Sequence, residues 1–126
     1  MLEISKTVEL EPDNAWMHFM RCKVKIDLHD TRGALLDVEK AIQLDDKIPD
    51  FFLMRGAINA ENEDYDSALL PYDKAIELDP KNWKAYRIRG SLKIDLGEVD
   101  DGCYDLSRAG EFGDPDVYDI IKEFCN

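Results

Sequence analysis

Few residues in this sequence could carry out nucleophilic or metal chemistry, and their spacing groups none of them. The three cysteines (Cys22, Cys103 and Cys125) contain no Cys-x-x-Cys motif, and the two histidines (His18 and His29) are not part of a His-Glu-x-x-His motif. A zinc site or a disulfide framework needs closer and more numerous cysteines, so we expect free thiols, structural histidines, no metal and no cofactor. Reduced cysteines favour a cytoplasmic location.

Length and charge further reduce the range of possible functions. The chain has 126 residues, enough for one domain, and a formal net charge of −12. This charge disfavours nucleic acid and anionic membranes as partners, because both are polyanions. No apolar run approaches the roughly 18 residues that a membrane span needs. Carboxylates are abundant but no nucleophile–base pair emerges, so we predict that the protein is not an enzyme, with catalysis as a remote alternative.

The strongest signal is a repeat of 34 residues. Lys40-Ala41-Ile42-Gln43-Leu44-Asp45 recurs as Lys74-Ala75-Ile76-Glu77-Leu78-Asp79, and more weakly over 108–112. Small residues keep the same step in two sets, Cys22, Gly56 and Gly90, then Ala34, Ala68 and Gly102. Recurring small residues at helical positions indicate that another helix approaches closely there. A period of 34 therefore predicts an all-α fold, an α-solenoid of tandem helix–turn–helix repeats.

The register predicts where each helix begins and ends. The expected helices are about 1–10, 15–28, 31–44, 49–62, 65–78, 83–96, 99–112 and 115–125. Acidic residues at the turns (Asp30, Asp64 and Glu98) are expected to cap the second helix of each pair, and Pro12 and Pro80 follow helix ends. Asp114 and Pro115 are expected to be the N-cap and first turn of a terminal amphipathic helix.

A set of charged positions also follows the repeat. Arg21, Arg55 and Arg89 recur in the first helices, followed one turn later by Lys25, Asn59 and Lys93. The position expected to face them in the second helices holds Asp37, Pro71 and Asp105. We predict that Asp37 pairs with Arg21 or Lys25, and Asp105 with Arg89 or Lys93; solvated charges are the alternative. Pro71 should bend or break its helix, leaving Arg55 to find an acid in a neighbouring repeat.

These features resemble the tetratricopeptide repeat (TPR) family. Residues 49–82 are the clearest copy, with the family's signature residues Phe52, Gly56, Tyr65, Ala68, Tyr72, Ala75 and Pro80. Residues 15–48 and 83–116 are two further copies, residues 1–14 look like the second helix of a partial repeat, and residues 115–126 look like a C-terminal capping helix. The resemblance predicts a single array over 1–126.

The resemblance implies a protein-interaction scaffold that binds a peptide or a partner segment in a concave groove. Carrying the register over, the partner-binding residues would be Trp16, Phe19, Lys23, Ile26, Asp50, Leu53, Ala57, Lys84, Arg87, Ser91 and Ile94. Some of these, Ile26 and Ile94 above all, could instead be core. The alternative is self-association, because Ile4, Val8 and Leu10 in residues 1–14 lack the helix on which they would pack. We therefore expect the array to be truncated at its N-terminal side only.

Some members of the family hold the C-terminal carboxylate of heat-shock chaperones through a set of lysines, asparagines and an arginine. In register this chain offers Phe19, Lys23, Met54, Lys84 and Ile88. Phenylalanine, methionine and isoleucine donate no hydrogen bond, so we expect no strong binding of such a tail and a more apolar ligand instead.

Overall fold

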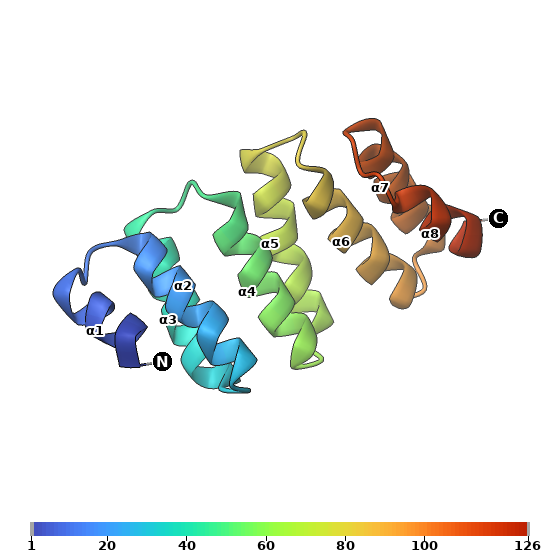
Figure 1. The fold of residues 1–126 in the computed structure, drawn as a ribbon. Coiled ribbons are helices and arrows are strands. Elements are labelled where there is room, and N and C mark those ends of the chain that lie inside the picture. The colour runs from blue at the N-terminus through green and yellow to red at the C-terminus, as the bar shows by residue number, and fades with distance from the viewer. Residues whose placement is uncertain (1, 126) are drawn as a thin grey trace. The chain divides into compact units, whose positions relative to one another are not determined.

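The computed structural model describes residues 2–125, and within them every regular element is an α-helix (Figure 1). The helices are α1 (Leu2–Leu10), α2 (Ala15–Asp27), α3 (Thr31–Leu44), α4 (Pro49–Glu61), α5 (Tyr65–Leu78), α6 (Trp83–Asp95), α7 (Val99–Glu111) and α8 (Val117–Phe124). Their bounds lie within two residues of the predicted ones. The prediction of an all-α chain of paired helices is confirmed.

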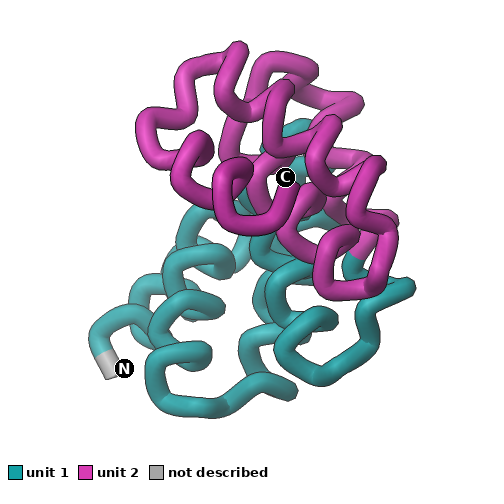
Figure 2. The backbone as a smooth tube through the Cα atoms, turned by 90° about the vertical axis from the view of Figure 1, so that its right-hand side faces the viewer, with its two compact units in different colours: residues 1–68 teal, residues 69–126 magenta. Residues whose placement is uncertain are grey.

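The chain forms two compact units, residues 1–68 and residues 69–126 (Figure 2). In the first unit, α2 packs against α1 and α3, and α3 packs against α4. In the second unit, α6 packs against α7, and α7 packs against α8. The single array over 1–126 stays a prediction.

The turns inside the helix pairs use the expected acidic caps in two of three copies. The Asp30 carboxylate accepts a hydrogen bond from the backbone N–H of Gly33 (2.9 Å), and that of Asp64 accepts from Ser67 (3.3 Å). Glu98 makes no such bond. Its side chain is one methylene longer than aspartate, which is the better N-cap residue.

The same turns require one residue with a positive φ angle, in register through all three copies. His29 and Glu63 both have φ of 62°, and Gly97 has φ of 90°. The next backbone N–H in each copy reaches back five residues, from Asp30 to the carbonyl of Lys25 (2.8 Å) for example. This is a Schellman ending, in which glycine is the residue without steric cost. The first two copies therefore hold a residue with a side chain (His29 and Glu63) at a positive φ angle, which is sterically unfavourable. Only the third copy has a glycine there.

A close approach of α6 and α7 explains the small residues of the third copy. A Cβ atom on Gly102 would lie 2.6 Å from the carbonyl oxygen of Gly90, and a Cβ on Gly90 would lie 2.7 Å from that of Gly102. The two backbones thus meet directly, as the recurring small residues predicted. In the first copy, Cys22 and Ala34 occupy the same two positions and are fully buried in one cluster.

The core of each unit is built from these helix faces. In the first unit, Cys22, Ala34, Val38 and Ile58 form one buried cluster, and Phe19, Ala41 and Phe51 form another. In the second unit, the buried cluster is Tyr86, Leu106, Ala109 and Val117. Val117 belongs to α8, so the terminal helix shares the core of the last helix pair.

The start of α8 differs from the prediction. The helix begins at Val117, and Asp114 and Pro115 lie before it. The Asp114 carboxylate accepts from the backbone N–H of Asp116 (3.0 Å) and also pairs with Arg87 on α6 (3.3 Å). The prediction that Asp114 caps this helix is wrong, because its side chain closes a local turn and binds a neighbouring helix instead.

The predicted break at Pro71 is absent. Helix α5 runs without interruption from Tyr65 to Leu78, with Pro71 inside it. The carbonyl that Pro71 cannot bond belongs to Ser67, four residues earlier. The side-chain amide of Asn59 on α4 donates to that oxygen (3.1 Å), so the acceptor is satisfied from another helix.

Candidate partner-binding faces

Buried carboxylates join the two helices of a pair. Asp37 on α3 accepts two bonds from the guanidinium of Arg21 (2.6 and 2.9 Å) and lies 3.0 Å from the Lys25 ammonium. Asp105 on α7 does the same with Arg89 (both 2.8 Å), and Lys93 lies 3.8 Å away. Both predicted pairings are confirmed. A bidentate guanidinium–carboxylate pair fixes geometry as well as charge.

The arginines also reach back to the preceding repeat. Arg89 contacts Asp73 of α5 (2.9 Å), and Arg55 contacts Glu39 of α3 (3.6 Å). Asp73 and Glu39 are 34 residues apart, as are the two arginines. Arg55, which lacks an acid in its own copy, thus finds one in the neighbouring repeat, as predicted. This second set of acids was missed by the sequence analysis, although its step of 34 was visible.

The electrostatics of Asp37 indicate a structural role. Burial by itself raises the pKa of this carboxyl, but the hydrogen bonds and charges of Arg21 and Lys25 outweigh it and hold the pKa below its ordinary value. Asp37 therefore stays ionised, with its oxygens bonded to cations. A carboxylate in this state is poorly suited to act as a general acid or base.

His18 is also structural. The Nε2 atom donates to the carbonyl oxygen of Pro12 (2.8 Å) and the residue is buried. Two copies further on, at twice the repeat length, the Tyr86 hydroxyl donates to the carbonyl of Pro80 (3.1 Å) in the same way. A polar aromatic side chain at this position ties each of these first helices to the proline before it.

The state of the cysteines differs from the prediction. Cys103 and Cys125 form a disulfide, with their Cα atoms 5.8 Å apart, and only Cys22 is a free thiol. Burial raises the pKa of Cys22 to about 11, so its thiol is protonated near neutral pH. The prediction of three free thiols is wrong, because the turn after α7 brings residue 125 back beside residue 103. The expectation of a cytoplasmic location loses the support that it drew from reduced cysteines.

In the first unit, the predicted partner-binding residues divide into exposed and buried ones. Trp16, Lys23, Asp50 and Ala57 are exposed, whereas Phe19 is only 3% exposed and Leu53 only 9%. Ile26 is half-buried against the core. Of the predicted residues in this unit, the exposed set is the part that a partner could reach without rearrangement of the core.

Trp16 is exposed but firmly held. Its ring lies edge-on to Phe51 (5.0 Å between centroids) and to Phe19 (5.6 Å), and 44% of the residue is exposed. The Asn14 side chain caps the helix start, accepting from the N–H groups of Trp16 and Met17. A rigid aromatic side chain offers contact area with little loss of conformational entropy.

An open hollow lies beside Trp16 at the turn between α1 and α2. Its lining combines apolar residues with three carboxylates, and consists of Leu10, Glu11, Pro12, Asp13, Asn14, Ala15, Trp16 and Asp45. Sequence reasoning missed this feature, because Asp45 comes from the end of α3, far from the turn in sequence.

In the second unit, the predicted residues have neighbours that the sequence did not indicate. Lys84 is exposed, and Arg87 is half-buried because it pairs with Asp114. Ser91 and Ile94 line a small hollow with Ile120 and Phe124 of α8. The terminal helix thus borders the face on which these residues lie.

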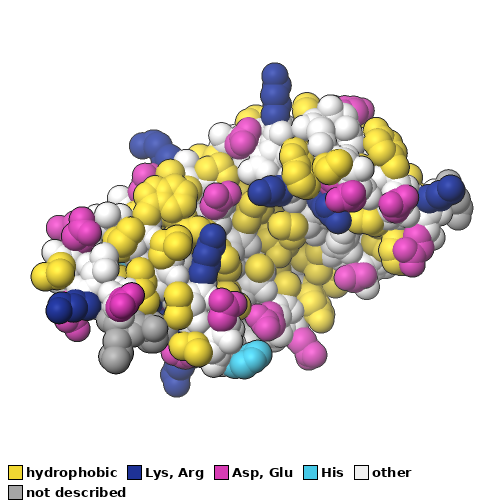
Figure 3. Space-filling view, viewed as in Figure 1, with side chains coloured by type: hydrophobic (Ala, Val, Ile, Leu, Met, Phe, Trp, Pro, Cys, Tyr) yellow, Lys and Arg dark blue, Asp and Glu magenta, His cyan; other side chains and the backbone are white. Residues whose placement is uncertain are grey.

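The surface shows no feature that points to a metal site or a membrane span in the described part of the chain. On the face in view, acidic and basic side chains are interspersed with exposed hydrophobic ones (Figure 3). Residues 2–125 contain no group of three or more metal-ligating side chains that could hold an ion. No helix in the described part of the chain is long and apolar enough to cross a membrane.

Comparison with known proteins shows the fold. No family model and no curated protein sequence matches the chain. Among solved structures, the first TPR domain of Spaghetti (RPAP3), bound to the HSP90 peptide SRMEEVD, has a TM-score of 0.82 at 16% identity, covering 89% of this chain and 90% of that one. The TPR domain of Arabidopsis OM64 has a TM-score of 0.81 at 19% identity, with 88% and 93% covered.

A third similar structure is MamA, with a TM-score of 0.80 at 21% identity, covering 86% of this chain. The present chain spans 64% of the MamA chain. At these identities the comparisons establish the fold, and the chain has the helix–turn–helix solenoid fold of tetratricopeptide repeat domains.

Proposed function

We propose that this protein is a non-enzymatic interaction scaffold that binds a peptide or a partner segment in the concave groove lined by its first helices. The observation that carries the proposal is Trp16, a large aromatic side chain that is exposed yet held by Phe19 and Phe51. Exposed, well-positioned aromatic residues are frequent energetic anchors of protein interfaces. The fold shared with a domain that holds a peptide supports the same class of function.

The two units offer different chemistry to a partner. In the first, Trp16 lies among the carboxylates of Glu11, Asp13 and Asp45, which suits an apolar segment that carries a positive charge. In the second, the exposed predicted residue is Lys84, whose ammonium lies 5.8 Å from the centre of the Trp83 ring. We propose Trp16, Asp50 and Ala57 as contact residues in the first unit and Lys84 and Ser91 in the second.

Catalysis is disfavoured by the state of the candidate groups. Asp37 and Asp105 are each ion-paired with an arginine, and the Cys22 thiol is buried and protonated. An enzyme needs a nucleophile or a base that can reach a substrate. None of these three groups meets that requirement.

The test is selection of peptides from a random displayed library on the immobilised protein, followed by calorimetry with the best binder. We expect Trp16→Ala or Lys84→Glu to weaken binding about tenfold or more. Matched controls are Leu36→Ala and Lys81→Glu, exposed residues outside the predicted set, which should change affinity less than twofold. Binding that is lost in the controls and kept in both variants would place the ligand elsewhere. Circular dichroism must show the same helix content throughout.

Self-association is the alternative, and one observation favours it. Leu10, at the end of α1, is 75% exposed, although Val8 on the same helix is buried. Sedimentation equilibrium of the wild type and of Leu10→Glu tests this alternative. A wild-type dimer that becomes a monomer on substitution would support self-association. A wild-type monomer at all concentrations would contradict it.

A further inference from the structure

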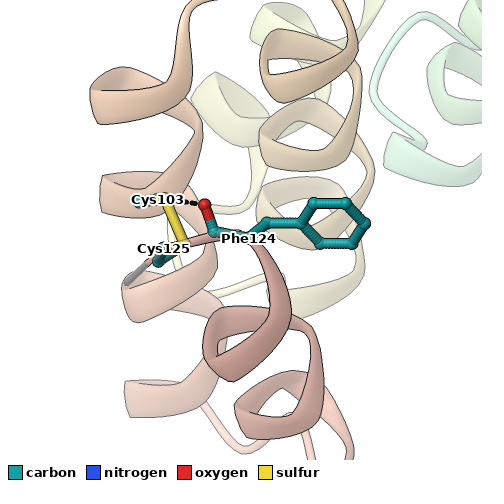
Figure 4. Close-up of a disulfide and its surroundings, with 3 residues drawn as sticks. All are labelled: Cys103, Phe124 and Cys125. Carbon is teal, nitrogen blue, oxygen red and sulfur yellow. Dashed lines mark hydrogen bonds between the residues drawn. A yellow bond between two sulfur atoms is a disulfide. The ribbon is translucent and has the colours of Figure 1, made fainter.

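The terminal helix α8 is held at both ends by contacts of different kinds. At its start, Val117 is fully buried in the core, and the preceding Asp114 pairs with Arg87. At its end, Cys125 is joined to Cys103 of α7 by the disulfide (Figure 4). The middle of the helix contributes less, because Ile120 and Ile121 are only partly buried.

Without the disulfide, the C-terminal end of α8 is held less firmly than its start. It is eight residues long, and a helix of this length is not stable by itself in water. No side chain caps its first turn. Tyr118 and Phe124 are exposed and add little burial. The covalent link is therefore a major restraint on the end of the helix, where Ile121 is only partly buried and Phe124 is exposed.

The link is accessible to small thiols. Both Cys103 and Cys125 are partly exposed, in contrast to Cys22. A thiolate of glutathione can attack one sulfur to give a mixed disulfide, which a second glutathione resolves. The balanced reaction converts the disulfide and two molecules of glutathione into two cysteine thiols and one molecule of oxidised glutathione. The reverse reaction, with oxidised glutathione as oxidant, restores the bond.

Release of α8 would change the face on α6. Ile120 and Phe124 lie beside Ser91, Ile94 and Asp95. Ser91 and Ile94 are among the residues predicted to bind a partner, so the position of α8 sets how much of that face a ligand can reach. Ile120, Ile121 and Cys125 pack against the cluster of Tyr86, Leu106, Ala109 and Val117, and this side of the cluster would become accessible when the C-terminal end of α8 opens.

We propose that the Cys103–Cys125 pair is a redox switch that controls the docking of α8. In the oxidised protein α8 is clamped onto α7 beside Ser91 and Ile94, and in the reduced protein its C-terminal end opens and uncovers apolar surface on α6 and α7. The effect on ligand binding rests on the proposed function; the opening of α8 does not.

The test is hydrogen–deuterium exchange of the full chain, oxidised with glutathione disulfide or reduced with dithiothreitol, with no partner added. Intact mass must first show the loss of two hydrogens on oxidation. We expect amide exchange over residues 117–125 to rise at least tenfold on reduction, with little change over residues 15–44, because a cross-link limits opening of the segment that it closes. Binding of a hydrophobic dye should rise in parallel.

Two variants make the result specific. Cys103→Ser should exchange like the reduced wild type under both conditions, and Cys22→Ser should keep the full difference. Equal exchange of residues 117–125 in oxidised and reduced wild type would overturn the switch, and so would a failure of Cys103 and Cys125 to form the bond with glutathione disulfide. Since no ligand is involved, either failure is independent of the outcome of the peptide selection.

Discussion

The side-chain amide of Asn59 takes the place of the backbone N–H that Pro71 lacks. It donates to the carbonyl oxygen of Ser67, the acceptor that a residue at position 71 would bond in an uninterrupted helix. In the first and third copies the same two positions hold a lysine and an aspartate that lie 3.0 and 3.8 Å apart. The same pair of positions thus holds a lysine–aspartate ion pair in two copies. In the other copy it holds an asparagine that bonds the carbonyl left without a donor by a proline.

Removal of this amide should be costly only while the proline is present. We expect Asn59→Ala to lower the free energy of unfolding by about 1–2 kcal/mol, because the Ser67 carbonyl loses its donor. In a Pro71→Ala background the backbone N–H returns, and the same change should cost about 1 kcal/mol less. Urea unfolding of the four proteins in a double-mutant cycle measures this coupling. A coupling near zero would mean that water satisfies Ser67 equally well.

Acid should weaken the first helix pair through Asp37. The pKa of Asp37 is lower in the folded than in the unfolded chain, so its contribution is complete above the unfolded value of about 4 and is lost as pH falls towards the folded value. Asp37→Asn should cost about 2–3 kcal/mol at pH 7, since Arg21 and Lys25 lose their common partner. The wild type should then lose more stability between pH 7 and pH 3 than this variant does.

The control for that experiment is Asp50→Asn, which removes an exposed acid at the start of α4. Urea titrations of the wild type and the two variants at both pH values give the six free energies. The same loss on acidification in Asp37→Asn as in the wild type would assign the pH dependence to other carboxylates.

Glycine should stabilise the two strained turns. His29→Gly and Glu63→Gly should each raise the free energy of unfolding by about 0.5–1 kcal/mol, because both residues have φ of 62°. Gly97→Ala should lower it by a similar amount, since Gly97 already has φ of 90° and its side-chain position is open. Thermal unfolding followed by circular dichroism measures all three. Destabilisation by both glycines would show that His29 and Glu63 make contacts that outweigh the backbone strain.

The contact between Gly90 and Gly102 should tolerate no added methyl group. We expect Gly102→Ala to cost about 2–3 kcal/mol, because its Cβ would lie 2.6 Å from a backbone oxygen that cannot move independently. Gly110→Ala is the matched control. Its Cβ would meet the end of the exposed Tyr118 side chain (2.9 Å), which can rotate away, and the Cγ1 of Val117 (3.1 Å), but no backbone atom, so its cost should be smaller.

A chaperone-type tail should bind weakly. Of the five positions that would hold its carboxylates, Phe19 is buried and Met54 and Ile88 cannot donate hydrogen bonds. A carboxylate buried there would lack partners, which costs several kcal/mol. Calorimetry with a peptide ending in Glu-Glu-Val-Asp should therefore show no binding in the low-micromolar range. Such binding, if abolished by Lys84→Ala, would contradict this account of the groove.

The repeat step predicted more of this structure than any motif did. Three features follow from residues that recur every 34 positions. They are the helices, the ion pairs that Asp37 and Asp105 each make with an arginine, and the close approach of Gly90 and Gly102. Each depends on contacts inside one helix pair, where sequence register fixes which side chains meet. The same step also relates the turn residues His29, Glu63 and Gly97. A comparison of Gly97 with the two residues in register with it would have predicted a positive φ angle at all three.

Features that belong to a single copy could not be found this way. Cys103 and Cys125 are 22 residues apart and have no counterpart in the other copies. Asp114 binds Arg87 across 27 residues, because α8 folds back beside α6 and α7. The hollow at Trp16 likewise joins a turn to the end of another helix. A repeat predicts what its copies share, and these contacts belong to one copy each.

The backward-reaching arginines have a consequence for how such a chain can grow. Arg55 meets Glu39 and Arg89 meets Asp73, so the second and third copies carry the cation for the joint behind them, and the first and second copies carry an acid for the joint ahead. Residues 49–82 contain both Arg55 and Asp73. An extra copy of this segment, inserted after Asn82, would supply its arginine to the original Asp73 and present its own aspartate to Arg89. Gene duplication in whole units of 34 codons would therefore lengthen the protein and keep this ion pair at the new junction.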